Sequence, residues 1–172
     1  MRRLERTGVA MAMAAAVGVI TIGACSKQVS GTAEVNQTDL AAYSTEISAS
    51  RAAAAQRAVG GACTALRTAN TSSVRAFNDY INASNDRGRN DPDANAKADV
   101  AVTTLHDNAH NVEVTVTNEV STDIATPLRA YRDDTNGLAD TLAQRAPTDT
   151  LNTAIDKFNA TKDVALAACQ GH

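Results

Sequence analysis

Residues 98–116 read ADVAVTTLHDNAHNVEVTV, and this stretch decides the fold class. Its last part, VEVTVT at 112–117, alternates in polarity as a β-strand would. Over the longer window, however, the apolar side chains recur every three or four positions, which is the repeat of a helix, at Ala98, Val102, Leu105, Ala109, Val112 and Val116. A single strand would also have no pairing partner elsewhere in the chain. The stretch therefore predicts a helix, and with it an all-α protein.

The region before this helix is also predicted to be helical. Thr38 or Asp39 can cap a helix, and apolar residues follow at helical spacing, namely Leu40, Tyr43, Ile47, Ala54, Ala58, Ala62 and Leu66. Gly60-Gly61 predicts a kink or a helix boundary, because each glycine costs a helix about 1 kcal/mol relative to alanine. Residues 70–73, NTSS, predict a second break with a fresh cap, so a separate short helix is expected over 74–84.

Turn signals divide the remaining chain. Residues 85–93, NDRGRNDPD, combine Gly, Pro, Asn and Asp and predict a loop. Asp91-Pro92 at its end is a favourable start for the next helix. Further helices are expected from Ser121 or Thr122 and, after a turn at 146–148, from about residue 149. Short loops between such helices favour an antiparallel bundle of four to five helices.

The first 24 residues are predicted to be a secretory signal and not part of the fold. A basic head, MRRLER, precedes an uncharged apolar run over 9–22 and two small residues. This run is shorter than the roughly 20 residues that a membrane-spanning helix needs. Residues 25–37 then predict a flexible tether that begins at Cys25, and residues 38–172 are expected to form the bundle domain.

The end of the signal, Ile22-Gly23-Ala24-Cys25, resembles the lipobox of bacterial lipoproteins. The resemblance implies that a peptidase cuts before Cys25 and that its thiol carries a diacylglyceryl group. Two or more acyl chains anchor a protein stably, so we expect a lipid anchor on the extracytoplasmic face of the cell membrane. The alternative is an ordinary secretory signal with an incidental cysteine. The Ala- and Arg-rich, Lys-poor composition and residues 29–33, VSGTA, are similar to small cell-envelope lipoproteins of mycobacteria and related actinobacteria.

Lipidation of Cys25 would leave Cys63 and Cys169 as an even pair in an oxidising compartment. We expect them to form a disulfide that staples the first helical region to the last. The chain-entropy model gives a bridge over so long a loop about 4–5 kcal/mol, as an upper figure. Two buried free thiols are the alternative.

The composition and motifs exclude several function classes. Removal of a signal with three Arg and one Glu lowers the formal net charge from −3 to −5, which argues against a nucleic-acid partner. The sequence has no Gly-x-Ser-x-Gly, phosphate-binding glycine loop or dinucleotide fingerprint, so we expect neither an enzyme nor a cofactor. His106, His110 and Glu113 share one side of a predicted helix, but the further ligands of a zinc site are missing, and no metal site is predicted.

One polar cluster is a candidate for recognition. Asn78, Asn82 and Asn85 share a face of the predicted short helix, although asparagine near a helix end also serves as a cap or a solvated side chain. We expect a non-enzymatic envelope lipoprotein with a binding or structural role, whose partners are the membrane, through Cys25, and another envelope protein. The alternative is a carrier for a small apolar or lipidic ligand, which predicts a sizeable cavity between helices lined by Leu, Val and Phe.

Overall fold

Asn36 is the first residue that the structure, a computed structural model, describes, and the description runs to His172. Within these residues the regular elements are four helices: α1 (Gln37–Arg87), α2 (Pro92–Thr115), α3 (Thr122–Ala143) and α4 (Thr148–Ala168). The predicted signal peptide (1–24), the lipid site Cys25 and the tether up to residue 35 lie outside the described residues.

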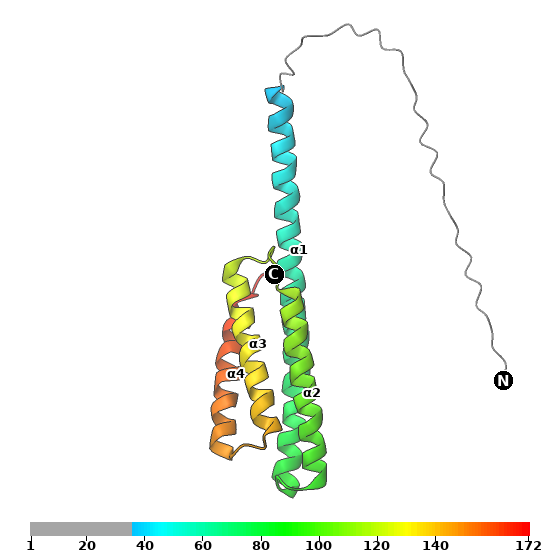
Figure 1. Cartoon of the computed structure of the whole chain (residues 1–172), viewed down its shortest axis with the longest axis vertical. Coiled ribbons are helices and arrows are strands. Elements are labelled where there is room, and N and C mark those ends of the chain that lie inside the picture. Colours follow the sequence, from blue (N-terminus) through cyan, green and yellow to red (C-terminus); the bar gives the residue numbers. More distant parts are fainter. Residues whose placement is uncertain (1–35) are drawn as a thin grey trace, which may run out of the picture. The chain divides into compact units, whose positions relative to one another are not determined.

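The helices alternate in direction and pack in chain order (Figure 1). α1 lies on α2, α2 on α3, and α3 on α4, and short loops join each pair. α1 and α4 would close the ring, but they touch far less than the other neighbouring pairs. The prediction of an all-α antiparallel bundle is confirmed, with four helices.

α1 is one continuous helix of 51 residues, so the predicted boundary at Gly60-Gly61 and the predicted break at 70–73 are both wrong. The reason is a buried stripe that passes through both sites and packs against the bundle, formed by Val59, Ala62, Cys63, Leu66, Ala69, Ser73, Phe77 and Tyr80. Such packing outweighs a glycine cost of about 1 kcal/mol. The Thr71 and Ser72 hydroxyls donate to carbonyls one turn earlier and do not cap a new helix.

α2 contains most of the ambiguous VEVTVT segment, which confirms the helical interpretation of residues 98–115. The predicted start is also confirmed. Asp91 is the N-cap residue, its side chain accepts a hydrogen bond of 2.8 Å from the Asp93 amide, and Pro92 occupies the first helical position.

The core of the bundle combines small and large side chains. Fully buried alanines allow the helices to approach closely, and they include Ala62, Ala94, Ala98, Ala101, Ala109, Ala139 and Ala165. Between them lie the larger buried side chains, chiefly Leu66, Leu105, Leu128, Tyr131, Leu138 and Leu142. Because each alanine buries little area, these few large residues supply most of the apolar burial.

Two arginines join the loops at the end of the bundle where α2 begins. Arg89 donates to the Ala146 carbonyl at 2.6 Å and to the Thr148 hydroxyl at 2.9 Å. Arg145, at a positive φ of 51°, donates to the Asp99 carboxylate at 2.6 Å and to both oxygens of Asn95. These bonds offset the strain that a non-glycine residue has at positive φ.

No helix in residues 36–172 is both long and apolar enough to cross a membrane.

Candidate functional site

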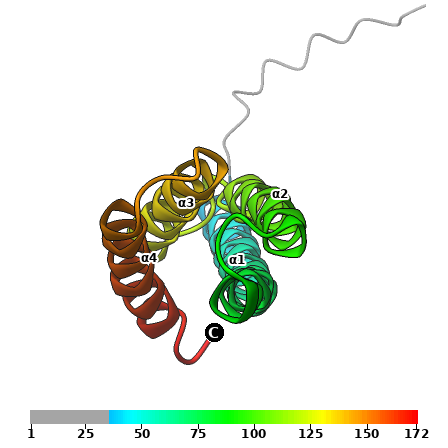
Figure 2. The same cartoon turned by 90° about the horizontal axis from the view of Figure 1, so that it is seen from below.

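The sparse contact between α1 and α4 leaves a cleft on that side of the bundle. Seen along the helices, the α1–α4 side is the open one (Figure 2). The cleft has a volume of about 120 Å³. All four helices contribute to its lining, which consists of Ser73, Val74, Phe77, Asn78, Leu105, Leu138, Ile155, Phe158 and Asn159.

Aromatic packing holds the two phenylalanines of the cleft in place. On α1, Phe77 packs edge-on against Tyr80, with ring centroids 5.9 Å apart. On α4, Phe158 packs against Tyr131 of α3, with centroids 5.6 Å apart. Such pairs add to the stabilisation from burial, so each phenylalanine of the cleft is held by a neighbouring aromatic ring.

A buried polar network lies beside the cleft. The Asn108 amide of α2 donates to the Ser72 and Ser73 hydroxyls of α1, at 2.8 and 2.9 Å. The Tyr131 hydroxyl lies near those of Ser73 and Thr135 but has no hydrogen-bond partner within residues 36–172. Burial raises the pKa of Tyr131 above 10.0, although the nearby hydroxyls oppose this shift. The network therefore contains a neutral phenol with unused hydrogen-bonding capacity.

This network is not among the features predicted from the sequence. Ser73, Asn108 and Thr135 are buried but polar, whereas the apolar spacing predicts only apolar residues in the core. A signal did exist in their spacing, because each stands at a helical interval between apolar core residues of its own helix. Ser73 lies between Ala69 and Phe77, for example.

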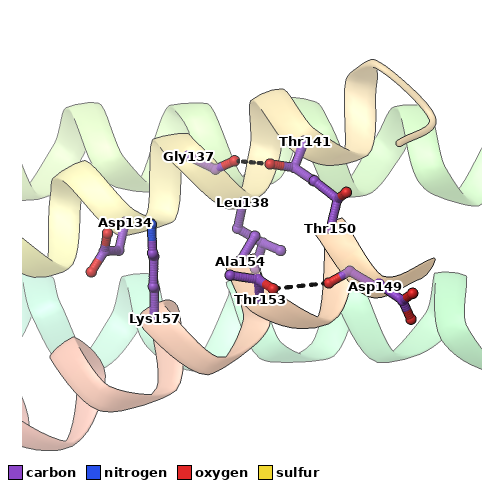
Figure 3. A pocket seen from close by; sticks show the side chains of 9 residues that line it. All are labelled: Asp134, Gly137, Leu138, Thr141, Asp149, Thr150, Thr153, Ala154 and Lys157. Carbon is purple, nitrogen blue, oxygen red and sulfur yellow. Dashed lines mark hydrogen bonds between the residues drawn. The ribbon is translucent and has the colours of Figure 1, made fainter. Parts of the chain in front are cut away.

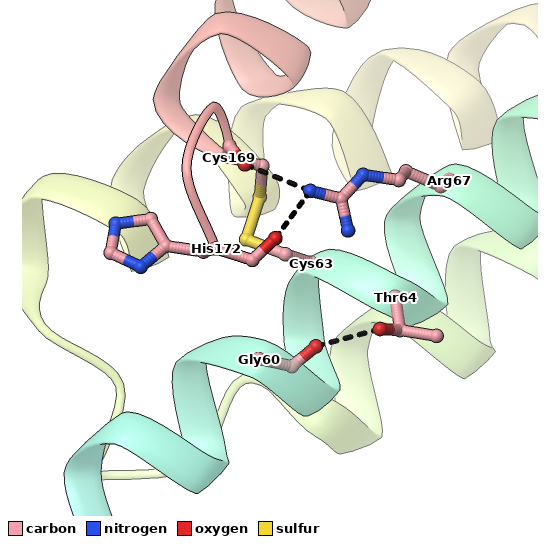
Figure 4. Close-up of a disulfide and its surroundings, with 6 residues drawn as sticks. All are labelled: Gly60, Cys63, Thr64, Arg67, Cys169 and His172. Atoms are coloured by element: carbon pink, nitrogen blue, oxygen red, sulfur yellow. Dashed lines mark hydrogen bonds between the residues drawn. A yellow bond between two sulfur atoms is a disulfide. The ribbon is translucent and has the colours of Figure 1, made fainter.

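The predicted disulfide is confirmed, and it joins α1 to the end of α4. Cys63 of α1 and Cys169 at the end of α4 are bonded, with their Cα atoms 5.5 Å apart. Arg67, one turn after Cys63, donates to the main-chain oxygens of Cys169 and His172 at 2.9 and 2.7 Å (Figure 4). The bridge and these bonds together fix the end of α4 to α1.

The structure brings only one residue of the predicted polar patch to the cleft. Asn78, Asn82 and Asn85 are all exposed on α1, and Asn78 lines the cleft. Asn82 and Asn85 lie further along α1, towards its C-terminal end. Recognition by these side chains stays a prediction.

His106, His110 and Glu113 do not converge on a common point. His106 lies 2.9 Å from Asn136 Oδ1 and 3.3 Å from an Asp140 carboxylate oxygen. His110 is exposed, and Glu113 pairs with Arg132 at 3.1 Å. Within residues 36–172 no group of three His, Cys, Asp or Glu side chains is arranged to hold a metal ion.

Two exposed carboxylates, one in the loop between α2 and α3 and one at the start of α3, have shifted pKa values. The Thr117 hydroxyl donates to Glu119 at 2.6 Å and lowers the pKa of this carboxyl. The nearby Ser121 hydroxyl lowers the pKa of Asp123, which stands in the first turn of α3. Acidic groups in a first helical turn stabilise the helix, so these shifts reflect local structure and not a reactive site.

A second recess lies on the outer surface between α3 and α4, with a volume of about 440 Å³ (Figure 3). Asp134 and Lys157 lie at one end of this groove, and Asp149 and Thr150 lie at the other. The Thr141 and Thr153 hydroxyls donate to carbonyls of their own helices. Six of its nine lining residues are polar, against three of nine in the α1–α4 cleft.

A comparison with known families matches residues 45–170 to the Rv2240c four-helix bundle domain. This family is named after a mycobacterial protein, which agrees with the predicted similarity to mycobacterial proteins. No curated protein and no solved structure matches the chain. The matched range covers most of the chain and nearly all of the four helices, and the protein therefore belongs to the family of the Rv2240c four-helix bundle domain.

Proposed function

We propose that this protein is a lipid-anchored, non-enzymatic protein of the cell envelope, in which α1 is a stalk that carries a binding bundle. The observation that supports it most is the first part of α1, residues 37–58, which we call the arm. The arm is helical, yet it contains no buried residue, and the first buried side chain of α1 is Val59 (Figure 1).

The arm has the dimensions of a spacer. At 1.5 Å per residue, its roughly 22 residues extend about 33 Å beyond the bundle. Its larger apolar side chains are open to solvent, with Leu40 at 49% and Tyr43 at 63% exposure. In the proposed arrangement the eleven residues 26–36 separate Cys25 from this arm, so the bundle stands away from the lipid surface.

The proposed anchor at Cys25 rests on the lipobox-like sequence of residues 22–25. Acyl chains on one residue hold a protein at a membrane through about 0.8 kcal/mol per buried CH₂ group. No basic cluster is needed for retention when two or more chains are present, which is compatible with the mildly acidic composition.

A binding role is favoured over a catalytic one by the kinds of buried polar group. Within residues 36–172 every Asp, Glu and His is exposed or half-buried, and the buried polar residues are Ser73, Asn108 and Thr135. Catalytic acids and bases commonly depend on burial to adjust their pKa values. Hydroxyl and amide groups in a fixed network are better suited to recognition.

The anchor is tested by fractionation of cells that express the protein or its Cys25→Ala variant. The protein should remain with membranes after a high-salt wash, and Cys25→Ala should be lost from that fraction. Ser26→Ala changes the neighbouring residue and keeps the thiol, so it is the matched control and should behave as the unaltered protein. Equal membrane retention of Cys25→Ala would refute the lipid anchor.

The stalk is tested by deletion of residues 41–54 from the arm. This removes about four helical turns, which leaves the phase of α1 nearly unchanged, and shortens the arm by about 21 Å. The thermal midpoint of the bundle should stay the same, because no buried residue is lost. Energy transfer from a dye on the bundle to a dye in the membrane should rise. An unchanged transfer efficiency, or a bundle that no longer folds, would argue against a spacer.

A further inference from the structure

We infer that the α1–α4 cleft is a binding site for a small, free apolar molecule that carries one hydroxyl group, of the size and chemistry of phenol. This inference does not depend on the lipid anchor. It rests on the volume of the cleft, on its lining and on the polar network beside it.

The volume sets the size of the ligand. An apolar cavity of about 150 Å³ lined by Leu, Ile and Phe accommodates benzene. At about 120 Å³ the α1–α4 cleft is slightly smaller and has an open side. It is well below the several hundred Å³ that drug-sized ligands need. A single six-membered ring therefore fits, whereas a folded acyl chain does not.

The lining sets the chemistry of most of the ligand surface. Leu105 and Leu138 are fully buried beneath the cleft, and Val74, Phe77, Ile155 and Phe158 form its sides. Asn78 is exposed and Asn159 half-buried, so their amides mark the side that reaches solvent. An apolar ring gains the most from contact with these walls.

The polar network explains why one hydroxyl is expected. Ser73 is fully buried and lines the cleft, and the unpartnered Tyr131 hydroxyl lies near it. An unsatisfied buried polar group costs free energy. A ligand hydroxyl at Ser73 would join the hydrogen-bond network of Ser72, Ser73 and Asn108. It would also add a hydrogen-bonding group to the region that contains the unpartnered Tyr131 hydroxyl.

The sparse contact between α1 and α4 also provides a way into the cleft. α4 is fixed to α1 at Cys63–Cys169, and elsewhere the two helices touch little. Admission of a ligand therefore disturbs few contacts, whereas a site between α1 and α2 would require tightly packed helices to separate.

The binding test is a titration of the complete bundle with benzene and phenol, followed through NMR signals of side-chain methyl groups. Saturable shifts are expected at Val74, Leu105, Leu138 and Ile155, which line the cleft. A ligand with so few atoms should bind with a dissociation constant of about 0.1–1 mM. Phenol should bind roughly three- to tenfold more tightly than benzene, as expected for one added hydrogen bond.

Four variants make the test specific. Val74→Trp fills the cleft from α1 and should weaken phenol binding by at least about tenfold; Ile155→Phe fills it from α4 and serves if the first variant does not fold. Val100→Trp makes a similar change at an exposed valine of α2, outside the cleft, and should bind normally. Ser73→Ala should abolish the preference for phenol, while Asn108 keeps its bond to Ser72.

Several results would overturn the inference. One is the absence of saturable shifts up to the solubility limit of both probes. Another is a set of shifts centred on exposed Val100 or Val164. Unchanged binding to a folded Val74→Trp or Ile155→Phe variant would show that the cleft is not the binding site. Equal affinity for benzene and phenol would show that the site does not recognise a hydroxyl group on the ligand.

Discussion

The guanidinium of Arg67 on α1 donates a hydrogen bond of 2.9 Å to the main-chain oxygen of Cys169 at the end of α4. Arg67 lies one helical turn after Cys63, which is bonded to the same Cys169. A short segment of α1 thus holds the end of α4 twice, once covalently and once through hydrogen bonds. This double attachment matters because α1 and α4 have few other contacts.

Loss of the bridge should destabilise the bundle strongly. Bridges that close long loops typically contribute about 2–5 kcal/mol, and Cys63 and Cys169 are 106 residues apart. The Cys63→Ala/Cys169→Ala variant should therefore lose free energy of unfolding in this range, measured by urea denaturation. Reduction of the unaltered protein should cause a similar loss. A variant with the urea midpoint of the oxidised protein would show that the bridge adds nothing.

Arg67→Ala should be costly only while the bridge is intact. In the oxidised protein the bridge keeps the end of α4 within reach of the guanidinium, so loss of these bonds should cost about 1 kcal/mol. Without the bridge the end of α4 should fray, and the same substitution should then cost close to nothing. A double-mutant cycle against the cysteine-free variant measures this coupling. Equal costs in both backgrounds would mean that Arg67 and the bridge act independently.

Alanine at the two central glycines of α1 should stabilise the protein. Gly60 and Gly61 lie inside a regular helix, and a Cβ atom at either position would meet nothing within 4 Å. Each substitution should raise the free energy of unfolding by about 0.5–1 kcal/mol. Gly88→Ala is the contrasting control, because Gly88 has a φ of 93° and should lose stability. A loss at Gly60 or Gly61 would imply that α1 bends there.

The same glycines show where prediction from the sequence stops. Periodicity identified residues 98–115 as helical despite VEVTVT, because six apolar positions outweigh a short alternation. The glycine and cap signals failed at Gly60-Gly61 and at 70–73, because local propensity costs about 1 kcal/mol per glycine whereas the packing of α1 on α2 extends over many residues. The surface of α2 on which α1 packs decides whether the helix continues, and a short stretch of the α1 sequence contains no information about that surface.

Neither the arm nor the cleft can be predicted from the sequence, and the two reasons are related. Leu40, Tyr43 and Ile47 continue the apolar spacing of the buried part of α1, so nothing in the pattern shows that Val59 is the first buried residue. The cleft depends on how far α4 lies from α1, which is a property of the assembled bundle. Cysteine parity, in contrast, needs no geometry, and it identified the Cys63–Cys169 bridge.

Tyr131→Phe should leave stability unchanged or increase it at neutral pH. Removal of a buried hydroxyl normally costs a hydrogen bond, but the Tyr131 hydroxyl has no partner within the described residues. Thermal unfolding of the two proteins should therefore differ by less than about 1 kcal/mol. A clear loss of stability would show that the phenol is bonded to Ser73 or Thr135 after all.

The same variant should change the response to alkali. Burial raises the pKa of Tyr131 above its usual value of 10.0, so the unfolded chain releases this proton at lower pH than the folded one. Stability from this group is complete below pH 10.0 and is lost as the pH rises from there towards the folded pKa. Tyr131→Phe should lose less stability than the unaltered protein over this interval. An identical alkaline loss in both proteins would contradict a raised pKa.

We propose that a lipid on Cys25 holds the bundle at the membrane, and the intact mass of the protein purified from membranes tests this anchor. The mass should correspond to a chain that begins at Cys25 and carries at least a diacylglyceryl group, and it should rise by two hydrogen atoms on reduction of the Cys63–Cys169 bridge. A mature chain that begins elsewhere, or one in which Cys25 carries no lipid, would contradict it.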